Sequence, residues 1–530
     1  MGDKYILDCT LRDGGYLNDW NFGHDNLVSI FERVTDANID FIEVGFLDDR
    51  MEFDVNRSIM PDSDSVNRIY GDLDKKNTKV IGMIDYGTCS INNITEKKYS
   101  YLDGIRVIFK KHLRREALEY CTRLKELGYM VFAQLVSVTS YTDEELMDLI
   151  RLANEVKPYA VSMVDTYGLM HQNNLSHYFK LLDRYLDSEI NLGYHGHNNF
   201  QMGYANCISM LSNETNRKLI VDGSIYGMGK SAGNAPLELV AMHMNRVFNK
   251  NYDISQILEA IDSNISQFYT PASWGYNMYF YLAALNDCHP NYVGYLMDKK
   301  TLSIKSINEI LSKLNDNNKL LYDKQYIESL YLNYQKNEVN DDNDYRRLSI
   351  EISNIPILVL GPGKTAIEEK DIISAYINDN NPIVISINYI SSYKNDYLFL
   401  TNSKRYVQLA SKLSKKSNLK IISTSNITKT GNYDFDYVLN YGLLIDPETE
   451  IIDNSLAMLI KVLIKLNCKE IVLAGFDGYS SQDKNYIDDI MEYDFIKQKY
   501  NYLNTYISEF IKKNREYIDI KFLTNTLYEL

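Results

Sequence analysis

Histidine and acidic side chains stand at the ends of short apolar runs in the first half of the sequence. His195 and His197 close the run "INLGYHGH", and Arg12 and Asp13 follow the run "KYILDC". Alternate residues of a strand point to the same side, so a strand here would present both imidazoles on one face. Together with the Asp13 carboxylate they form a three-ligand set that leaves open positions for a substrate. This pattern favours a divalent-metal site over two histidines that merely share hydrogen bonds. The expected metal is Mn or Mg, with Zn, Co or Fe as alternatives.

Eight short apolar or β-branched runs must position these residues. They lie at 4–9, 41–46, 79–85, 104–109, 130–138, 159–165, 190–197 and 218–225. The segments between them, such as "NLVSIFERVTDAN" and "DEELMDLIRLANEV", carry apolar residues at helical spacing. Eight strand-helix units within residues 1–250 predict a closed parallel (β/α)8 TIM barrel, with an open doubly wound sheet as the alternative.

In such a barrel the active site lies at the C-terminal ends of the strands. Three further features fall there: Glu43 in the second run, Asp165 at the end of the sixth, and the segment "GMGKSAGNAPLE" after the eighth. The spacing of Gly227, Gly229 and Gly233 is G-x-G-x-x-x-G, which differs from the dinucleotide-binding fingerprint. Spacing alone therefore leaves open whether this segment is a turn or a binding loop.

Five motifs together indicate a family. "CTLRDGG", "IEVGF", "VDTYGL", "YHGHNNFQMGYAN" and "GMGKSAGNAPLE" occur in the order found in metal-dependent lyases and synthases. The chain resembles the superfamily that includes 4-hydroxy-2-oxovalerate aldolase, hydroxymethylglutaryl-CoA lyase and isopropylmalate synthase. The aldolase branch is the most similar, because Claisen-type synthases usually carry Glu-Arg where this chain has Lys230 and Ser231. The resemblance implies carbon-carbon bond chemistry on a 2-oxo acid through a metal-bound, pyruvate-like enolate. A Claisen-type condensation with an acyl-CoA is the alternative.

The resemblance also implies roles for individual residues. Asp13, His195 and His197 would bind the metal, with Asn234 as a fourth ligand. Arg12 would stabilise negative charge on the enolate oxygen. Residues that would support the catalytic arginine, the ligands or the substrate are Glu43, Asp165, Gly227 and Gly229.

Tyr16 departs from the aldolase pattern. Where those enzymes carry a histidine general base four residues after the arginine, this chain has a tyrosine. A tyrosine with an ordinary pKa near 10 is a poor base at pH 7. Either Tyr16 is activated, or another group such as His112 or a metal-bound water serves, or the reaction differs.

After residue 250 the strand runs cease. Residues 251–335 predict a helical extension of the barrel, in which Trp274, Tyr276 and His289 could lie near the barrel mouth, although aromatic residues at helical spacing are more often core. The acidic, Asn-rich segment 336–350 predicts a linker.

Residues 351–530 alternate strand and helix again and predict a Rossmann-like α/β domain. Its "ILVLGPGKT" is not a Walker sequence, because Leu358 stands where the first glycine is required. Gly361, Gly363 and Lys364 could still present backbone N–H groups to a phosphate. The domain resembles bacterial sialyltransferase and pterin pyrophosphokinase domains, and a purely structural domain that mediates assembly is the alternative.

Composition limits the other classes of function. The net charge of -15 argues against a generic nucleic-acid binder. No signal peptide is visible, and no apolar run of about 18 residues could span a membrane. The six scattered cysteines are expected to be reduced and buried. These features predict a cytoplasmic protein. The fusion of the barrel to a Rossmann-like domain suggests a biosynthetic pathway. The family resemblance implies an enzyme that acts on a small 2-oxo acid, and we expect it to be a homo-oligomer. An iron oxygenase and a degenerate barrel that serves as a scaffold are its rivals.

Overall fold

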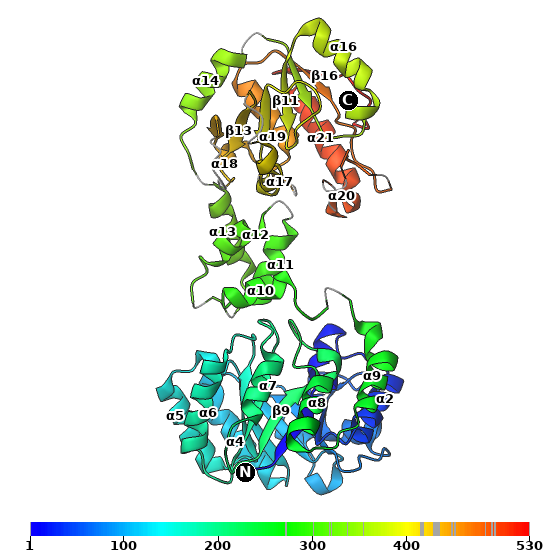
Figure 1. Cartoon of the computed structure of the whole chain (residues 1–530), viewed down its shortest axis with the longest axis vertical. Helices are drawn as coiled ribbons and strands as arrows, with labels where there is room; N and C mark the ends of the chain where they lie inside the picture. Colours follow the sequence, from blue (N-terminus) through cyan, green and yellow to red (C-terminus); the bar gives the residue numbers. More distant parts are fainter. Residues whose placement is uncertain are drawn as a thin grey trace. The chain divides into compact units, whose positions relative to one another are not determined.

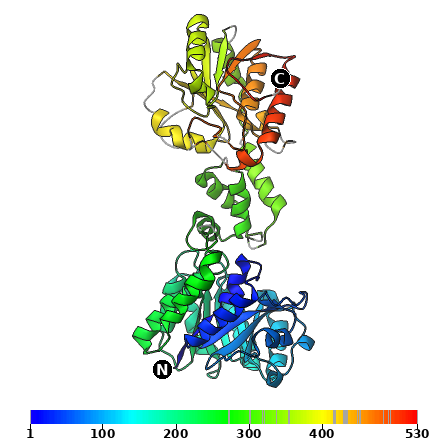
Figure 2. The same cartoon turned by 90° about the vertical axis from the view of Figure 1, so that its right-hand side faces the viewer.

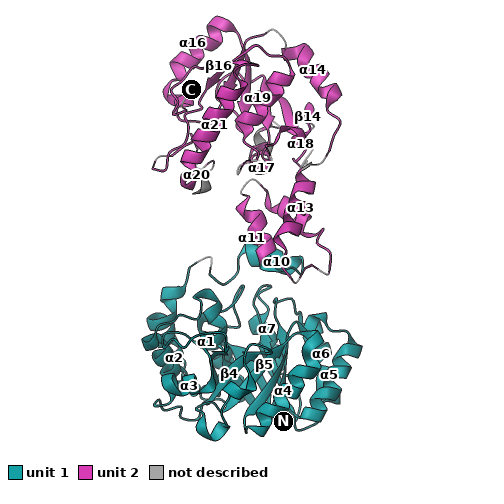
Figure 3. Ribbon diagram, turned by 180° about the vertical axis from the view of Figure 1, so that it is seen from behind, with its two compact units in different colours: residues 1–290 teal, residues 291–530 magenta. Residues whose placement is uncertain are grey.

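The chain folds into two compact units, Met1–Pro290 and Asn291–Leu530 (Figure 3). The computed structural model describes residues 2–270, 273–299, 302–316, 318–319, 321–336, 338–352, 355–413, 418–427, 435–446, 449, 452–482, 484–488, 491 and 494–528. No helix in these ranges has both the length and the apolar character needed to cross a lipid bilayer.

Eight parallel strands of the first unit close into a barrel (Figures 1 and 2). They are β1 (Lys4–Asp8), β2 (Phe41–Leu47), β4 (Lys79–Asp85), β5 (Gly104–Phe109), β6 (Met130–Leu135), β7 (Ala160–Asp165), β8 (Asn191–Gly196) and β9 (Leu219–Gly223). β1 pairs with both β2 and β9, which closes the ring, and the two-residue β3 (Ile59–Met60) lies beside β2. Every predicted run overlaps one of the eight strands, so the TIM barrel prediction is confirmed.

Helices surround the barrel strands (Figure 1). The helices of this unit are α1 (Thr10–Asp13), α2 (His24–Asp36), α3 (Ser63–Tyr70), α4 (Arg114–Glu126), α5 (Asp143–Val156), α6 (Gln172–Tyr185), α7 (Gly203–Leu211), α8 (Leu237–Phe248), α9 (Ile254–Ala260) and α10 (Met278–Leu285). Local sequence fixes some of their ends. α5 begins at a capping box, because the Thr142 hydroxyl accepts from Glu145 N and the Glu145 carboxylate accepts from Thr142 N.

The interior of the barrel has an apolar layer and a polar layer. One core cluster combines inward-facing residues of six strands with Cys9: Leu7, Cys9, Phe41, Ile81, Phe132, Ala160 and Ile220. Two positions after Phe41, Phe132, Ala160 and Ile220 stand the buried polar residues Glu43, Gln134, Ser162 and Asp222. Arg106 and His195 stand two positions after Gly104 and Gly193 in their own strands. Because side chains alternate along a strand, this second layer points inward, nearer the C-terminal ends of the strands. The fold thus gathers polar groups where barrel active sites lie.

The second unit contains a parallel seven-stranded sheet. Its strands are β10 (Ile357–Leu360), β11 (Ile383–Ile387), β12 (Tyr397–Leu400), β13 (Lys420–Thr424), β14 (Tyr437–Leu439), β15 (Glu470–Ala474) and β16 (Asp519–Phe522), in the order β14-β13-β12-β11-β10-β15-β16. Its helices are α11 (Pro290–Asp298), α12 (Ile304–Leu311), α13 (Lys324–Lys336), α14 (Asp342–Ile352), α15 (Thr365–Glu368), α16 (Lys370–Asn380), α17 (Ser403–Leu413), α18 (Tyr441–Leu444), α19 (Ser455–Lys465), α20 (Asp494–Gln498) and α21 (Tyr500–Asn514).

Both faces of this sheet are buried. On β10, Ile357 and Val359 belong to a core that includes residues of α14, α19 and α21. The alternate residues Leu358 and Leu360 belong to another cluster, which includes Ile373 of α16. A parallel sheet with both faces covered explains why its strands read as continuous apolar runs.

The predicted boundaries after the barrel need correction. The segment 336–350, predicted as a linker, is largely helix α14, whose Tyr345, Leu348 and Ile352 are buried against the second sheet. Helices α12 and α13, predicted as a barrel extension, belong to the second unit, since the division falls at residue 290 rather than at 250 and 335. Apolar residues at helical spacing lie among the acidic residues of 336–350, and the linker prediction did not take them into account.

Candidate active site

Three predicted metal ligands come together at the top of the barrel. Asp13 ends α1, His195 lies in β8, and His197 follows that strand. One ligand atom from each lies within 4.8 Å of the others, and all three residues are buried. The two imidazole rings are nearly perpendicular, with centroids 5.2 Å apart. The sequence-based ligand set is therefore assembled as a compact cluster.

Hydrogen bonds orient both imidazoles. His195 Nδ1 lies 2.9 Å from Asp222 Oδ2, and His197 Nδ1 lies 2.9 Å from the Lys230 carbonyl oxygen. Because a carboxylate and a carbonyl accept hydrogen bonds, each Nδ1 carries the hydrogen and each Nε2 keeps its lone pair. Burial lowers the pKa of His197 to about 4, although the charge of Asp13 opposes this effect. A neutral histidine is the form that binds a metal.

Asn234 supplies a further oxygen. Its Nδ2 donates to Asp13 Oδ2 across 2.8 Å. Its Oδ1 is buried and, in the described part of the chain, has no hydrogen-bond partner. An orphaned buried acceptor beside one carboxylate and two imidazoles fits a divalent cation, which would satisfy that oxygen.

Arg12 is held by two carboxylates. Its Nε donates to Glu43 Oε2 across 2.7 Å, and its Nη1 donates to Asp13 Oδ1 across 2.5 Å. Burial would raise the pKa of Asp13, but the charge of Arg12 and the hydrogen bond from Asn234 lower it, and this pKa lies well below its ordinary value. Asp13 is therefore ionised, and Glu43 positions the arginine.

A network inside the barrel was missed by the sequence reasoning. Arg106 of β5 donates from Nη2 to Asp222 Oδ2 at 2.5 Å and to Gln134 Oε1 at 2.8 Å, and its Nη1 lies 3.3 Å from Glu43 Oε2. Arg106 thus links the carboxylate that orients His195 to the one that holds Arg12. A charged residue within the apolar run "GIRVIF" was the available signal, because a buried charge requires partners.

Gly229 allows the loop after β9 to approach the ligands. A Cβ atom there would lie 2.2 Å from Asn234 Nδ2 and 2.5 Å from Asp13 Oδ2. Gly227 contributes its carbonyl oxygen, which accepts from Asn234 N across 3.0 Å. Both glycines therefore serve the close packing of the ligand residues.

Asp165 supports the loop after β7. Its carboxylate accepts from Leu169 N at 2.8 Å and from Met170 N at 2.9 Å, while its carbonyl accepts from His197 N at 3.2 Å. Burial raises the pKa of Asp165 to about 6. These contacts place Asp165 behind His197 as a positioning residue.

Tyr16 lies beside the cluster in the short helix Gly14–Leu17. Its ring contacts Trp20 and Phe46, with centroids 4.8 and 6.2 Å away, and its side chain is 40% exposed. Desolvation raises the pKa of Tyr16 to about 12, and this effect exceeds the lowering by Arg12. The phenol keeps its proton at neutral pH, so this environment does not activate Tyr16 as a base.

The other candidates near the mouth differ in their environments. His112 is exposed in the short helix before α4, Lys111–Leu113. Trp274 is buried and donates from Nε1 to the Tyr226 carbonyl oxygen at 2.9 Å, whereas Tyr276 is 60% exposed. Burial and the nearby charge of Lys230 both lower the pKa of His289.

In the glycine turn of the second unit, at residues 361–365, backbone N–H groups already donate to other residues of the chain. Gly361 N donates to Ala474 O and Gly363 N to Gly475 O, both across 2.8 Å. Thr365 N donates to Asp477 Oδ2 across 3.0 Å. The prediction that this turn offers its N–H groups to a phosphate is corrected accordingly, because those of residues 361, 363 and 365 have acceptors. No described hydrogen bond assigns Lys364 a role.

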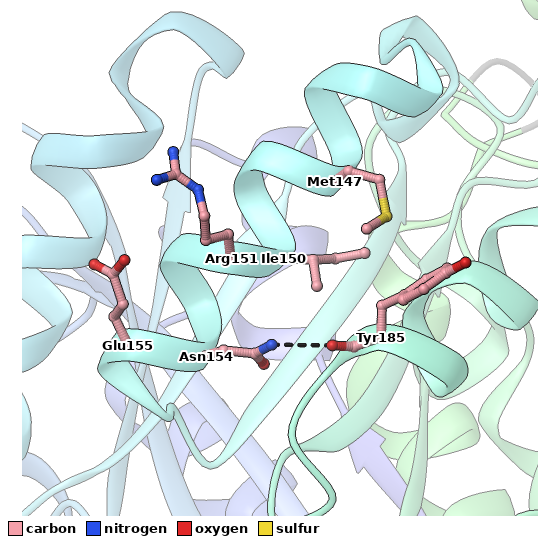
Figure 4. Close-up of a pocket in the computed structure, with 6 residues that line it drawn as sticks. All are labelled: Met147, Ile150, Arg151, Asn154, Glu155 and Tyr185. Atoms are coloured by element: carbon pink, nitrogen blue, oxygen red, sulfur yellow. Dashed lines mark hydrogen bonds between the residues drawn. The ribbon is translucent and has the colours of Figure 1, made fainter.

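A shallow pocket of about 370 Å³ lies elsewhere, on the outside of the barrel between α5 and α6 (Figure 4). Its lining residues are Met147, Ile150, Arg151, Asn154, Glu155 and Tyr185. Asn154 Nδ2 donates to the Tyr185 carbonyl oxygen at 2.9 Å, which ties the two helices together. None of the predicted site residues lines this pocket.

The first unit is thus a parallel α/β barrel with a buried Asp-His-His cluster at the C-terminal ends of its strands. Residues 4–263, which lie within the barrel unit, match the model of the HMGL-like family.

Named relatives match the same half of the chain. A 4-hydroxy-2-oxovalerate aldolase of Marinomonas sp. (strain MWYL1) is 25% identical over 272 residues, which are 50% of this chain and 78% of the relative. An oxaloacetate decarboxylase of Mycobacterium tuberculosis (strain ATCC 25618 / H37Rv) is 25% identical over 278 residues, 50% of this chain and 76% of the relative. Among solved structures, the N-terminal domain of a candidate aldolase from Bacteroides vulgatus has a TM-score of 0.48 at 23% identity, covering 57% of this chain and 99% of that domain.

Proposed function

We propose that the first unit is a divalent-metal-dependent carbon-carbon lyase that acts on a 2-oxo acid and releases pyruvate or a related enolate product. The observation that carries this proposal is the cluster of Asp13, His195 and His197 beside an arginine that two carboxylates hold in place. The aldolase and decarboxylase relatives support the same reaction class.

Asp13, His195 and His197 would hold the ion, with Asn234 Oδ1 as a fourth ligand. When bound, a divalent ion supplies Lewis-acid stabilisation of negative charge next to the 2-oxo group. Mn and Mg are our first choices, because a carboxylate and an amide oxygen contribute to the set.

Arg12 is the chain's own group for the developing oxyanion. Glu43 and Asp13 engage its Nε and Nη1, and Nη2 has no hydrogen bond to any described residue. The guanidinium is buried and fixed, so it can donate to an oxygen without reorganising. Fixed donors of this kind stabilise the enolate more strongly than the ground-state ketone.

Tyr16 would act as a hydrogen-bond or proton donor rather than as the base. Its raised pKa keeps the hydroxyl protonated at neutral pH. Asp85, the last residue of β4, is an alternative acceptor of protons, since it lies at the C-terminal end of a barrel strand. Burial also raises the pKa of Asp85, which would make this carboxylate a stronger base.

Two rivals from the sequence are less well supported. A degenerate scaffold would not need to retain three buried ligands with their hydrogen-bond partners. A Claisen condensation predicts release of CoA, which a thiol reagent would detect. A homo-oligomeric state and a biosynthetic role are further proposals that come from the sequence alone.

Pyruvate release provides the test. The full chain, loaded with Mn²⁺ or Mg²⁺, is offered a panel of 4-hydroxy-2-oxo acids and oxaloacetate, and pyruvate is measured by coupling to lactate dehydrogenase. We expect turnover that chelation abolishes and that Asp13→Asn and His195→Ala prevent. A protein that takes up no divalent metal, or that releases no pyruvate from any compound, would contradict the proposal.

A further inference from the structure

Lys230 is anchored within the ligand cluster by its backbone. Its N donates to Asp13 Oδ2 across 3.1 Å, and its carbonyl oxygen accepts from His197 Nδ1 across 2.9 Å. Its carbonyl also accepts from Gly233 N across 3.0 Å. The Cα atom is therefore fixed beside the candidate metal ligands, and the ammonium lies within one lysine side-chain length of them.

The side chain of Lys230 is seated on Tyr16. Its Nζ lies 5.0 Å from the centroid of the Tyr16 ring, which is packed edge-to-face by Trp20 and Phe46. A cation above an aromatic face is attracted by the negative charge of the ring face. The two positions at which this chain departs from the aldolase or synthase patterns thus contact each other.

The positive charge of Lys230 is not matched by an ion pair. In the described ranges, no carboxylate lies within 4.0 Å of its Nζ, whereas Arg12 has two such partners. Nearby groups that influence its charge are Arg12, Asp13 and Asp85, and it in turn influences His197 and His289. The ammonium therefore has no fixed carboxylate partner among the described residues and can pair with an incoming anion.

We propose that the Lys230 ammonium, seated on the Tyr16 ring, binds a second anionic group of the substrate. The substrate would then be a short dianionic 2-oxo acid. Its first carboxylate, next to the 2-oxo group, belongs at the ligand cluster and Arg12, and a second carboxylate or phosphate at its other end pairs with Lys230. This inference rests on the proposed function and specifies its substrate class.

Substrate preference provides the kinetic test. Pyruvate release is compared for 4-hydroxy-2-oxopentanoate, whose far end is uncharged, and 4-hydroxy-2-oxoglutarate, whose far end is a carboxylate. We expect the wild type to favour the dianion in kcat/KM by at least about 10-fold, the value of one charge-assisted hydrogen bond. Lys230→Gln should lower kcat/KM for the dianion by about 10- to 100-fold and should change kcat/KM for the monoanion little.

Two controls accompany this comparison. Lys98→Gln removes the same charge from a side chain that is 61% exposed and paired with Glu96. This variant should therefore leave kcat/KM unchanged for both substrates. Tyr16→Phe keeps the ring beneath the ammonium, whereas Tyr16→Leu removes it, so only Tyr16→Leu should reduce the preference for the dianion. Mn²⁺ affinity equal to that of the wild type would show that Lys230→Gln leaves the cluster intact.

Binding provides a second readout that does not depend on turnover. The chain has two tryptophans, Trp20 beside Tyr16 and the buried Trp274 of the barrel unit, so intrinsic fluorescence reports on this region. The Mn²⁺-loaded protein is titrated with 2-oxoglutarate and with 2-oxobutanoate. Tighter binding of 2-oxoglutarate that Lys230→Gln removes would support the inference.

Two results would overturn it. The first is an equal loss of kcat/KM on both substrates in Lys230→Gln. Lys230 would then only stabilise the ligand cluster and would not bind the second anionic group. The second is a wild type with no preference for the dianion in either assay. If the wild type neither cleaves nor binds any of these 2-oxo acids, the proposed function itself fails, and this inference fails with it.

Discussion

Asp222 Oδ2 accepts a hydrogen bond from His195 Nδ1 across 2.9 Å inside the barrel, although 27 residues separate the two in sequence. Burial would raise the pKa of Asp222, but Arg106 and His195 lower it below its ordinary value. The carboxylate is therefore ionised and fixes the histidine with Nε2 directed away from it.

Asp222→Asn should weaken Mn²⁺ binding by about 10- to 100-fold, because the amide neither holds the imidazole as firmly nor compensates Arg106. Isothermal titration calorimetry measures the affinity. The exposed pair of His177 and Asp143, whose Nε2 and Oδ1 atoms lie 2.8 Å apart, offers a matched control. Asp143→Asn should leave Mn²⁺ affinity unchanged, and an unchanged affinity in Asp222→Asn would refute the orienting role.

Arg12→Lys should lower kcat by about 10²- to 10³-fold, the usual loss for one preorganised donor to an oxyanion. A lysine cannot engage Glu43, Asp13 and the substrate together. Steady-state kinetics of pyruvate release at saturating Mn²⁺ give kcat, and calorimetry gives Mn²⁺ affinity, which should fall by at most about 10- to 100-fold, because Arg12 also hydrogen-bonds the ligand Asp13. Arg114→Lys, which alters an arginine paired with Asp148 on the outside of the barrel, is the control. A loss confined to metal affinity would reassign Arg12 to ligand positioning.

Tyr16→Phe should lower kcat by only about 10-fold, the value of one hydrogen bond, and leave the shape of the pH-rate profile between pH 6 and 9 unchanged. The reason is that the pKa of Tyr16, raised to about 12, lies outside this range. A base would behave differently. Loss of nearly all activity, together with the disappearance of a rate-controlling ionisation from the profile, would identify Tyr16 as the proton acceptor.

Asp8 should make the barrel less stable as pH rises. Burial, reinforced by Glu43 and Asp222 and opposed by hydrogen bonds from Thr10, raises the pKa of Asp8 from 3.8 to about 7. Between these values the folded chain keeps a proton that the unfolded chain has released. The stabilisation is therefore complete below about pH 4 and is lost as pH rises towards 7, at a slope of at most about 1.4 kcal/mol per pH unit.

Asp8→Asn imitates the protonated carboxyl and should reduce this slope. Thermal unfolding from pH 4 to 8 measures it, and the variant should gain stability relative to the wild type as pH rises. Asp143→Asn, at a carboxyl that is 64% exposed, is the control. Parallel pH profiles for Asp8→Asn and the wild type would contradict the assignment.

Thr365→Val should destabilise the second unit by about 1–3 kcal/mol, because it leaves buried polar groups without partners. The Thr365 hydroxyl donates to Asp477 and contacts Thr524 Oγ1 at 3.0 Å. Calorimetry that resolves two unfolding transitions should show a shift in one of them only. Thr526→Val, which removes a local acceptor for Tyr528 N, is the milder control. Equal effects of the two variants would argue against a special role for the Asp477 contact.

The sequence predicted the barrel and its ligand cluster because both depend on local patterns. Short apolar or β-branched runs marked the strands, and polar residues after those runs marked the site. The contact between Arg106 and Asp222 was not predicted, since a charge inside a strand can be assigned a partner only when the order of strands is known. The prediction that the Gly361 turn offers its N–H groups to a phosphate failed for a similar reason. These N–H groups donate to residues more than 100 positions later. Helix α14 was overlooked although Tyr345, Leu348 and Ile352 already had helical spacing.

Asn234 donates to Asp13 across 221 positions of sequence, and β1 needs β9 as a neighbour. During translation the candidate site therefore stays incomplete until most of the barrel has left the ribosome, and β1 presents an unpaired edge until residues 219–223 emerge. Exposed edges of this kind invite pairing with other chains. Truncations before residue 219 should consequently aggregate, so nascent barrel chains would benefit from a chaperone over that interval.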